Sequence, residues 1–243
     1  MKRPFLWILA ASICAGFSAQ AEVLSKSKTI AGLKVEYKVI LPEHFDPAKT
    51  YPAVLSFPGG SQTMQIVQTD IDRGLRAEAE KRGYIVILPA APNGQLFFEK
   101  GERVFPEFLK QILADYPVRD GRFHIAGHSN GGISAFHIAA RYPQYFLSIT
   151  GYPGYLENPA PSRIAAISKM CINMHVGELD ADWRQEMLEQ STQFRAKGLK
   201  VRFTVEKGEH HLIAAFAGAG AAWLFDQFDE AAKGCLSKEA EPK

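Results

Sequence analysis

Short apolar runs alternate with longer amphipathic runs along most of the chain. Residues 84–88 are apolar at almost every position, as is typical of a central strand in a parallel sheet. Runs with apolar residues at helical spacing separate such strands. Strands that alternate with helices predict an α/β fold: a mostly parallel central sheet with helices on both faces. The predicted strands are residues 53–57, 84–88, 123–126, 147–150, 170–176 and 201–206, after a hairpin within 27–41 that turns at Gly32. The predicted helices are residues 71–81, 104–115, 133–141, 183–197 and 213–232.

The first residues have the pattern of a secretory leader. Lys2-Arg3 is basic, residues 5–17 are apolar but too short to span a bilayer, and Ala19-Gln20-Ala21 is a small-x-small cleavage site. We therefore expect residues 1–21 to be a signal peptide that is cleaved after Ala21. The protein is then periplasmic or secreted; an uncleaved N-terminal anchor is the alternative.

Residues 22–243 have the length and composition of a single globular domain. Loss of Lys2 and Arg3 with the leader lowers the 28 basic residues to 26, which equals the number of acidic residues. This balance, without a basic run, argues against a nucleic-acid partner. No segment after residue 21 is long and apolar enough to span a membrane. In an oxidising compartment we expect a disulfide between Cys171 and Cys235, with two separate buried thiols as the alternative.

One short turn carries the strongest chemical signal. Gly127-His128-Ser129-Asn130-Gly131 follows an apolar strand and precedes an Ala-rich helix. Strand, sharp turn and helix form the context that makes Gly-x-Ser-x-Gly a nucleophile elbow. Glycines two residues from the serine are needed because side chains there would collide in so tight a turn. The alternative is a Gly-rich loop ahead of a helix.

A serine hydroxyl needs a base and a third group that orients the base, and in the α/β-hydrolase order both follow the serine. His137 lies in the helix after the elbow, where it packs or faces solvent. His175 lies inside an apolar strand and is read as structural. His210 and His211 follow a strand, in the kind of loop where sites form in open α/β sheets.

The acid is expected at the end of the strand at 170–176, within Gly177-Glu178-Leu179-Asp180-Ala181-Asp182. Asp182 precedes the predicted helix and is assigned as its N-cap. Asp180 is the preferred triad acid over Asp182 and Glu178. A solvated loop charge is the alternative for each carboxylate.

An oxyanion hole needs two backbone N–H donors. The residue after the nucleophile, Asn130, supplies one. The loop Pro58-Gly59-Gly60-Ser61 is expected to supply the other, from Gly60 or next from Ser61, because glycine lets the backbone approach a substrate closely. A simple Gly-Gly turn is the alternative.

Aromatic residues follow several of the predicted strands and could line a cleft. We expect Phe97, Tyr152 and Trp183 to contact the substrate, with Phe98 and Tyr155 nearby. The alternative is that these rings cover the edges of the core. No long insertion separates the core elements, so a cap domain is not expected.

These motifs resemble the α/β-hydrolase superfamily. The chain is similar over residues 35–228 to exported esterases of the polyhydroxybutyrate-depolymerase-like and feruloyl-esterase-like kind. The elbow carries the resemblance most specifically, followed by the acid turn at 177–180 and the histidine loop at 207–211. The family often has glycine before its histidine, where His210 stands if His211 is the base. Pro58 replaces the histidine of the usual His-Gly pair in the oxyanion loop.

The sequence thus predicts an exported serine hydrolase that cleaves carboxylic esters through Ser129, His211 and Asp180 and an acyl-enzyme. The substrate is a small-molecule or polymer-linked ester. No cofactor is required, and no residues have metal-ligand spacing. Two rival functions are a serine peptidase with the same triad and an inactive binding protein on the same scaffold.

Overall fold

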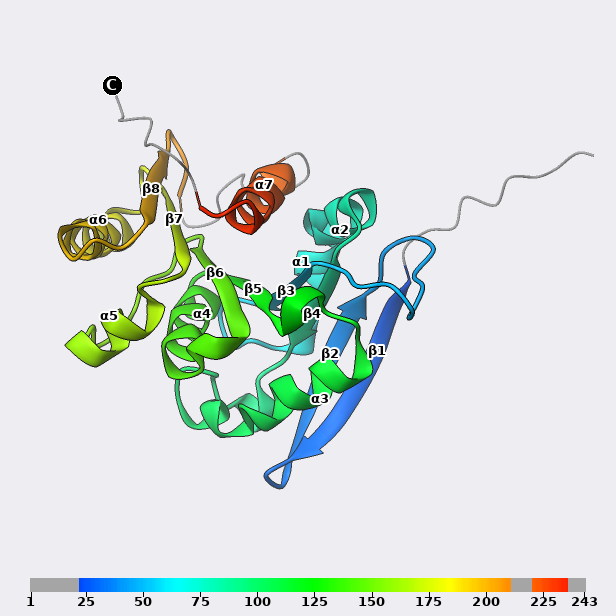
Figure 1. The fold of residues 1–243 in the computed structure, drawn as a ribbon. Helices are drawn as coiled ribbons and strands as arrows, with labels where there is room; N and C mark the ends of the chain where they lie inside the picture. The colour runs from blue at the N-terminus through cyan, green and yellow to red at the C-terminus, as the bar shows by residue number, and fades with distance from the viewer. Residues whose placement is uncertain (1–21, 211–219, 236–243) are drawn as a thin grey trace, which may run out of the picture.

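The computed structural model describes residues 22–210 and 220–235. Within these residues eight strands form one sheet in the order β1-β2-β4-β3-β5-β6-β7-β8 (Figure 1). Strand β2 is antiparallel to β1 and β4, and all other neighbours are parallel. The mostly parallel α/β sheet predicted from the sequence is therefore confirmed. The strands are β1 (Val23–Ile30), β2 (Leu33–Ile40), β3 (Ala53–Phe57), β4 (Ile85–Pro89), β5 (Phe123–Gly127), β6 (Phe146–Gly151), β7 (Cys171–Gly177) and β8 (Val201–Glu206).

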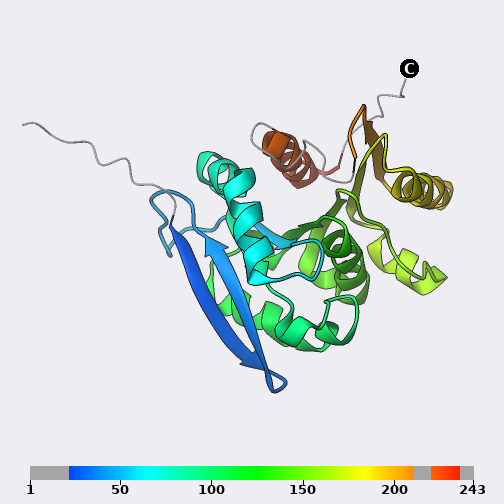
Figure 2. The same ribbon diagram turned by 180° about the vertical axis from the view of Figure 1, so that it is seen from behind.

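Helices cover both faces of the sheet, as Figures 1 and 2 show from opposite sides. One face packs against α3 (Glu107–Asp115), α4 (Asn130–Arg141), α5 (Pro161–Ile167) and α6 (Ala181–Ala196). The other packs against α1 (Met64–Asp70), the π-helix η1 (Ile71–Leu75), α2 (Arg76–Arg82) and α7 (Gly220–Ala232). Short 3-10 turns are η2 (Pro92–Gly94), η3 (Lys100–Val104), η4 (Arg119–Gly121) and η5 (Pro143–Tyr145). No helix within residues 22–210 and 220–235 is both long and apolar enough to cross a bilayer.

The position of β4 in the sheet explains why its residues are all apolar instead of alternating between apolar and polar. Ile85 and Ile87 belong to the core on the α3–α6 face, whereas Val86 and Leu88 belong to the core on the α7 face. Successive side chains of a strand point to opposite faces, so a strand covered on both sides must be apolar at every position.

The predicted helix at 71–81 is part of a longer helical segment. The segment begins at Met64, where the Thr63 side chain accepts a hydrogen bond from the N–H of Ile66 at 3.4 Å. It contains the π-helical turn η1, in which Gly74 has φ +155°. Helix α5 was not predicted, because its seven residues are too few to display a clear apolar period. Residues 213–219 of the predicted last helix lie outside the described residues.

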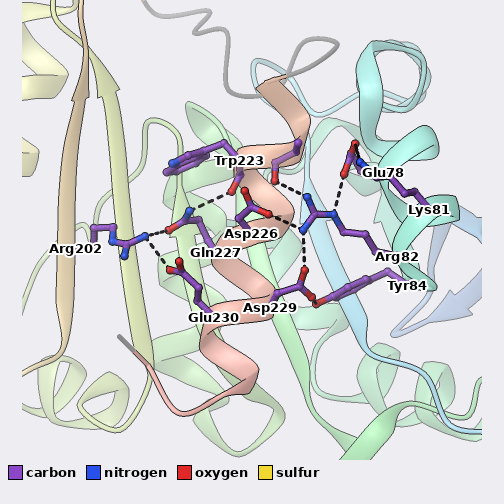
Figure 3. A network of polar contacts seen from close by, with 11 residues as sticks. Glu78, Lys81, Arg82, Tyr84, Arg202, Trp223, Asp226, Gln227, Asp229 and Glu230 are labelled. Atoms are coloured by element: carbon purple, nitrogen blue, oxygen red, sulfur yellow. Dashed lines mark hydrogen bonds and ion pairs between the residues drawn. The ribbon is translucent and has the colours of Figure 1, made fainter. Parts of the chain in front are cut away.

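Helix α7 is bound on both sides by arginines from other elements (Figure 3). Arg82 at the end of α2 donates to Asp226 and Asp229 of α7, each at 2.7 Å. On the opposite side, Arg202 of β8 donates to Gln227 at 2.7 Å and to Glu230 at 2.9 Å. These contacts attach α7 to both β8 and α2.

A disulfide joins Cys171, the first residue of β7, to Cys235, just after α7. The disulfide prediction is therefore confirmed. The bridge connects the last helix to the strand that leads into the predicted acid turn.

Candidate active site

Ser129 lies between the end of β5 at Gly127 and the start of α4 at Asn130. Its backbone has φ +56° and ψ −127°, a conformation that non-glycine residues rarely adopt. Such strained residues persist only where the surroundings determine the conformation, and they cluster at active sites. The N–H of Ser129 donates to the carbonyl of Pro153 at 2.9 Å, which helps to hold the turn. The strand–turn–helix geometry is the one expected for a nucleophile elbow.

The glycines around Ser129 are required by backbone contacts. A Cβ on residue 127 would overlap the carbonyl of Gly131, and a Cβ on residue 131 would overlap the carbonyl of Phe57. A Cβ on residue 132 would overlap the carbonyl of Pro153. The tightness of the turn itself therefore excludes a side chain at residue 127, and packing against β3 and the loop after β6 excludes one at residues 131 and 132.

The loop after β3 lies beside the elbow. Gly60 has φ +54°, and its carbonyl accepts a hydrogen bond from the Asn130 side chain at 2.9 Å. Among residues 22–210 and 220–235, no acceptor is bound to the backbone N–H of Gly60, Ser61 or Asn130. These three N–H groups include the donors expected for an oxyanion hole.

Gln62 connects this loop to its surroundings. Its side chain is fully buried, donates to Ser134 Oγ at 2.8 Å and accepts from the N–H of Phe97 at 3.1 Å. A buried amide with both ends bonded holds the loop in one conformation, because breaking either bond leaves a buried polar group unpaired.

The acid turn follows β7, and Asp180 is half-buried at the N-cap position of α6. Asp182 lies within the first turn of α6, so its assignment as the N-cap is wrong. The helix begins two residues earlier than the sequence pattern suggested, because Ala181 and Asp182 already adopt helical geometry. Asp182 instead is an exposed acid near the helix N-terminus, where its charge is favourable.

The acid turn and the histidine loop pack backbone to backbone. Glu178 N–H donates to the carbonyl of Glu206, and Leu179 N–H donates to that of Glu209, both at 2.8 Å. A Cβ on Gly177 would overlap the carbonyls of Glu209 and His210. The structure therefore brings the segment that carries Asp180 against the segment that ends at His210. The side chain of His210 is exposed, and His211 lies outside the described residues.

Two of the three predicted substrate contacts are core residues instead. Phe97 is fully buried and packs against Phe57, with ring centroids 5.1 Å apart. Tyr152 is 2 % exposed and lies 5.9 Å from the ring of His128. Both predictions fail because the loops that carry these rings turn them inward. Trp183 remains partly exposed and packs against Tyr155 at 5.2 Å, close in sequence to the acid turn.

The other histidines after Ser129 have structural surroundings. His175 lies against Trp223 with ring centroids 4.2 Å apart, and burial lowers its pKa to about 4. His137 donates from Nε2 to Glu102 at 2.8 Å, because its Nδ1 faces Arg163, which can only donate. Their assignment as residues outside the triad agrees with these contacts.

A cavity of about 380 Å³ lies beside the second half of α4. Its walls include Glu102, His137, Arg141 and Arg163. Helical rise places this part of α4 roughly 12–18 Å from Ser129. The cavity is therefore separate from the elbow.

Sequence reasoning missed a buried pair beneath the elbow. His128 Nε2 lies 3.1 Å from Asp70 Oδ2, and both side chains are buried. Asp70 stands among the apolar positions Val67 and Ile71 of one helical face. A carboxylate within an apolar stripe is seldom buried without a partner, and this was the available signal.

Comparison with known proteins places the chain in a family. The family model described as "Putative esterase" matches residues 27–223. Dipeptidyl-peptidase 5 of Porphyromonas gingivalis is 32% identical over 139 residues, which are 52% of this chain but only 20% of that protein. The chain thus spans about a fifth of the length of this curated relative.

Solved structures of esterases share the fold. A thermostable esterase superposes with a TM-score of 0.69 at 20% identity, over 84% of this chain and 62% of that one. A ferulic acid esterase gives 0.62 at 22% identity, over 79% and 92%. An S-formylglutathione hydrolase from Agrobacterium tumefaciens gives 0.63 at 18% identity, over 88% and 95%. The chain therefore belongs to the esterase family, and its fold is that of the α/β-hydrolases.

Proposed function

We propose that the protein is an exported serine hydrolase that cleaves carboxylic esters with Ser129, His211 and Asp180. The strained backbone of Ser129 at the elbow is the observation that carries this proposal. It is supported by the N–H groups beside Ser129, which have no acceptor among the described residues, and by the packing of the acid turn against the histidine loop. Membership of the esterase family supports the ester as substrate class.

In the proposed reaction, Ser129 Oγ attacks the ester carbonyl while its proton passes to His211. The N–H groups of Asn130 and Gly60 stabilise the negative charge that forms on the carbonyl oxygen. Collapse of this intermediate expels the alcohol, which takes the proton from His211, and leaves an acyl group on Ser129. Water then attacks with His211 as the base and releases the acid, while Asp180 orients the imidazole. Trp183 is proposed to border the substrate.

The direct test uses p-nitrophenyl esters and covalent labelling. Ser129→Ala should lose turnover by three orders of magnitude or more. A fluorophosphonate should lose fluoride and modify Ser129, as peptide mass spectrometry will detect. Ser162→Ala is the matched control. Ser162 is exposed and lines the cavity beside the second half of α4, away from the elbow. Full activity of Ser129→Ala would exclude the proposed nucleophile.

A serine peptidase is the second candidate, favoured by the sequence similarity to dipeptidyl-peptidase 5. Amide and ester substrates with the same acyl group separate the two functions, for example a p-nitroanilide and a p-nitrophenyl ester. Faster turnover of the amide would make the protein a peptidase. No turnover and no fluorophosphonate label would instead favour a binding protein on this scaffold.

Export is proposed from the leader pattern of residues 1–21, and the disulfide between Cys171 and Cys235 supports an oxidising compartment. Mass spectrometry of the natively expressed protein should find Glu22 at the N-terminus. Thiol titration of that processed chain, unfolded without reductant, should find no free thiol. An intact Met1 in the cytoplasm would contradict export.

A further inference from the structure

The residue before Ser129 binds the loop expected to form the oxyanion hole. The N–H of Gly59 points at His128 Nε2, 3.0 Å away, in a buried contact. A Cβ on residue 59 would lie 2.6 Å from His128 Cε1, so the ring packs directly on the glycine backbone. The backbone at Gly59 is thereby tied to the turn that carries Ser129.

The residue after Ser129 binds the same loop one residue further on. The side-chain nitrogen of Asn130 donates to the carbonyl of Gly60 at 2.9 Å. The peptide between Gly59 and Gly60 carries the Gly60 N–H. The peptide group on each side of it is thus held by a hydrogen bond to a neighbour of Ser129. Two adjacent glycines would otherwise rotate freely, whereas an oxyanion donor must be oriented before the reaction.

Asp70 competes with Gly59 for the same ring nitrogen. Its Oδ2 lies 3.1 Å from His128 Nε2, and its Oδ1 has no hydrogen-bond partner within the described residues. Nε2 carries either a lone pair or a hydrogen. Only the lone pair can accept the Gly59 N–H; a hydrogen on Nε2 would bond to Asp70 and leave the Gly59 N–H without an acceptor.

We propose that His128 is a positioning residue of the oxyanion hole. With Nε2 unprotonated, it accepts the Gly59 N–H and, together with Asn130, orients the Gly60 N–H toward the developing oxyanion. Asp70 is a competitor for this nitrogen rather than a member of the catalytic set. The inference rests on the proposed function, since it assigns a role in the same reaction.

Two substitutions at His128 separate positioning from packing. In His128→Gln the amide oxygen can accept the Gly59 N–H while the amide nitrogen donates to Asp70, so we expect kcat within about fivefold of wild type. His128→Leu fills the space without an acceptor, and we expect kcat to fall about 10- to 100-fold. That loss is smaller than the 10²–10³ of removing an oxyanion donor outright. KM should stay within about threefold, because the effect arises in the transition state.

A purely structural role predicts the opposite order, since leucine suits a buried site better than glutamine. Leucine that retains kcat, or glutamine that loses as much as leucine, would overturn the proposal. Asp70→Asn should keep kcat within about fivefold, because it removes only the competing carboxylate. A loss as large as that of His128→Leu would mean that Asp70 and His128 act as a pair, which also contradicts the proposal.

The two neighbours of Ser129 should act together on the orientation of the Gly60 N–H. Asn130→Ala should lower kcat by a similar factor, and the double variant His128→Leu/Asn130→Ala should lose less than the product of the two factors. Losses that multiply would show independent roles and overturn the shared positioning. Melting temperatures check folding; if His128→Leu does not fold, His128→Gln and Asn130→Ala still give the test. Activity that survives Ser129→Ala removes the proposed function itself, whereas an essential Ser129 with no effect at His128 removes this inference alone.

Discussion

The N–H of Leu179 donates to the carbonyl of Glu209 at 2.8 Å. This bond joins the acid turn to the histidine loop, which lies about 30 residues later in the sequence. Glu178 Oε2 accepts the N–H of Gly208 at 2.9 Å as a second link. Parallel strands β7 and β8 end side by side, so the loops that follow them meet at the carboxyl edge of the sheet. The acid turn and the histidine loop are therefore positioned by backbone contacts rather than by side chains alone.

Gly177 is the residue on which this junction is expected to depend. In Gly177→Ala the added Cβ would overlap the carbonyls of Glu209 and His210, so the two loops must separate. We expect a loss of about 1–3 kcal/mol in the free energy of unfolding and at least a tenfold fall in kcat. Urea unfolding and aryl-ester turnover measure the two effects.

Gly208→Ala is the matched control in the facing loop. A Cβ there meets nothing within 4 Å, but φ is +73°, so only backbone strain of roughly 1 kcal/mol is added. Its turnover should stay close to wild type. If Gly208→Ala impairs turnover as much as Gly177→Ala, contact between the loops is not what matters.

Arg82 is predicted to be the main polar attachment of α7 (Figure 3). Its side chain is 17% exposed and its guanidinium binds Glu78 as well as Asp226 and Asp229. Tyr84 also donates to Asp229 at 2.7 Å. Arg82→Met keeps the aliphatic stem but leaves these carboxylates without their cation. We expect about 2–3 kcal/mol of lost stability in urea unfolding, because hydrogen bonds to charged groups are the strong ones.

Lys81→Met tests whether the position of the charge decides this effect. Lys81 lies next to Arg82, but its side chain is 69% exposed, and its ion pair with Glu78 is long, at 3.7 Å. Exposed pairs of this kind contribute little, so the change should stay within about 0.5 kcal/mol. Equal losses in both variants would mean that net charge, not attachment of α7, controls stability.

The elbow could be predicted from the sequence because its requirements are local. The strained backbone at Ser129 and the close packing at Gly127 and Gly131, the latter against Phe57, all require residue types that stand within five consecutive positions. The central parallel strands could likewise be predicted from the sequence, because a strand that is buried on both faces must be apolar at every position. The disulfide was an expectation from cysteine count and compartment, and the fold brings the two cysteines together.

The failures concern residues whose role depends on distant parts of the chain. Phe97 was expected in a cleft, but the ring packs on Phe57 of a strand 40 residues earlier. The Asp70–His128 pair spans 58 residues and has no sequence motif. For Asp182, helix propensity alone does not define the first helical residue, and α6 begins at Ala181 with Asp180 as its N-cap.

His124 is expected to make the protein less stable in mild acid. Burial lowers its pKa from 6.5 to about 4, although the charge of Asp229 acts in the opposite direction. The unfolded chain therefore binds a proton between pH 6.5 and 4 that the folded chain does not. The free energy of unfolding should be highest above pH 6.5 and fall by up to about 1.4 kcal/mol per pH unit down to pH 4 for this group.

The slope of the unfolding free energy with pH measures how many protons the unfolded chain binds in excess of the folded chain. His124→Asn should lower this number by about one. The asparagine can replace Nδ1 in the 2.8 Å contact with Ser148 but does not titrate. His175, whose pKa burial also lowers to about 4, offers a matched variant, and His124→Asn/His175→Asn should remove about two protons from the slope. Urea unfolding at several pH values from 7 to 4 gives the slopes. An unchanged slope in the double variant would contradict burial of these histidines as neutral groups.

The adjacent histidines decide the proposed mechanism most directly. The carbonyl of His210 lies against Gly177, so the backbone of this residue is part of the junction with the acid turn, while its side chain is exposed. The resemblance to esterases drawn from the sequence implies a base that closely precedes the last helix, and on this ground we propose His211. We expect His211→Ala to lower ester turnover by three orders of magnitude or more, as loss of a triad member does.

His210→Ala should cost roughly tenfold or less, because it removes only a side chain next to the base. Both variants should keep the wild-type melting temperature within a few degrees, so that a loss of turnover reflects chemistry rather than unfolding. If the two effects are reversed, His210 is the base and occupies the position where the family often has glycine, while the hydrolase proposal stands. If neither substitution matters although Ser129→Ala abolishes turnover, the base lies elsewhere and the proposed triad is wrong.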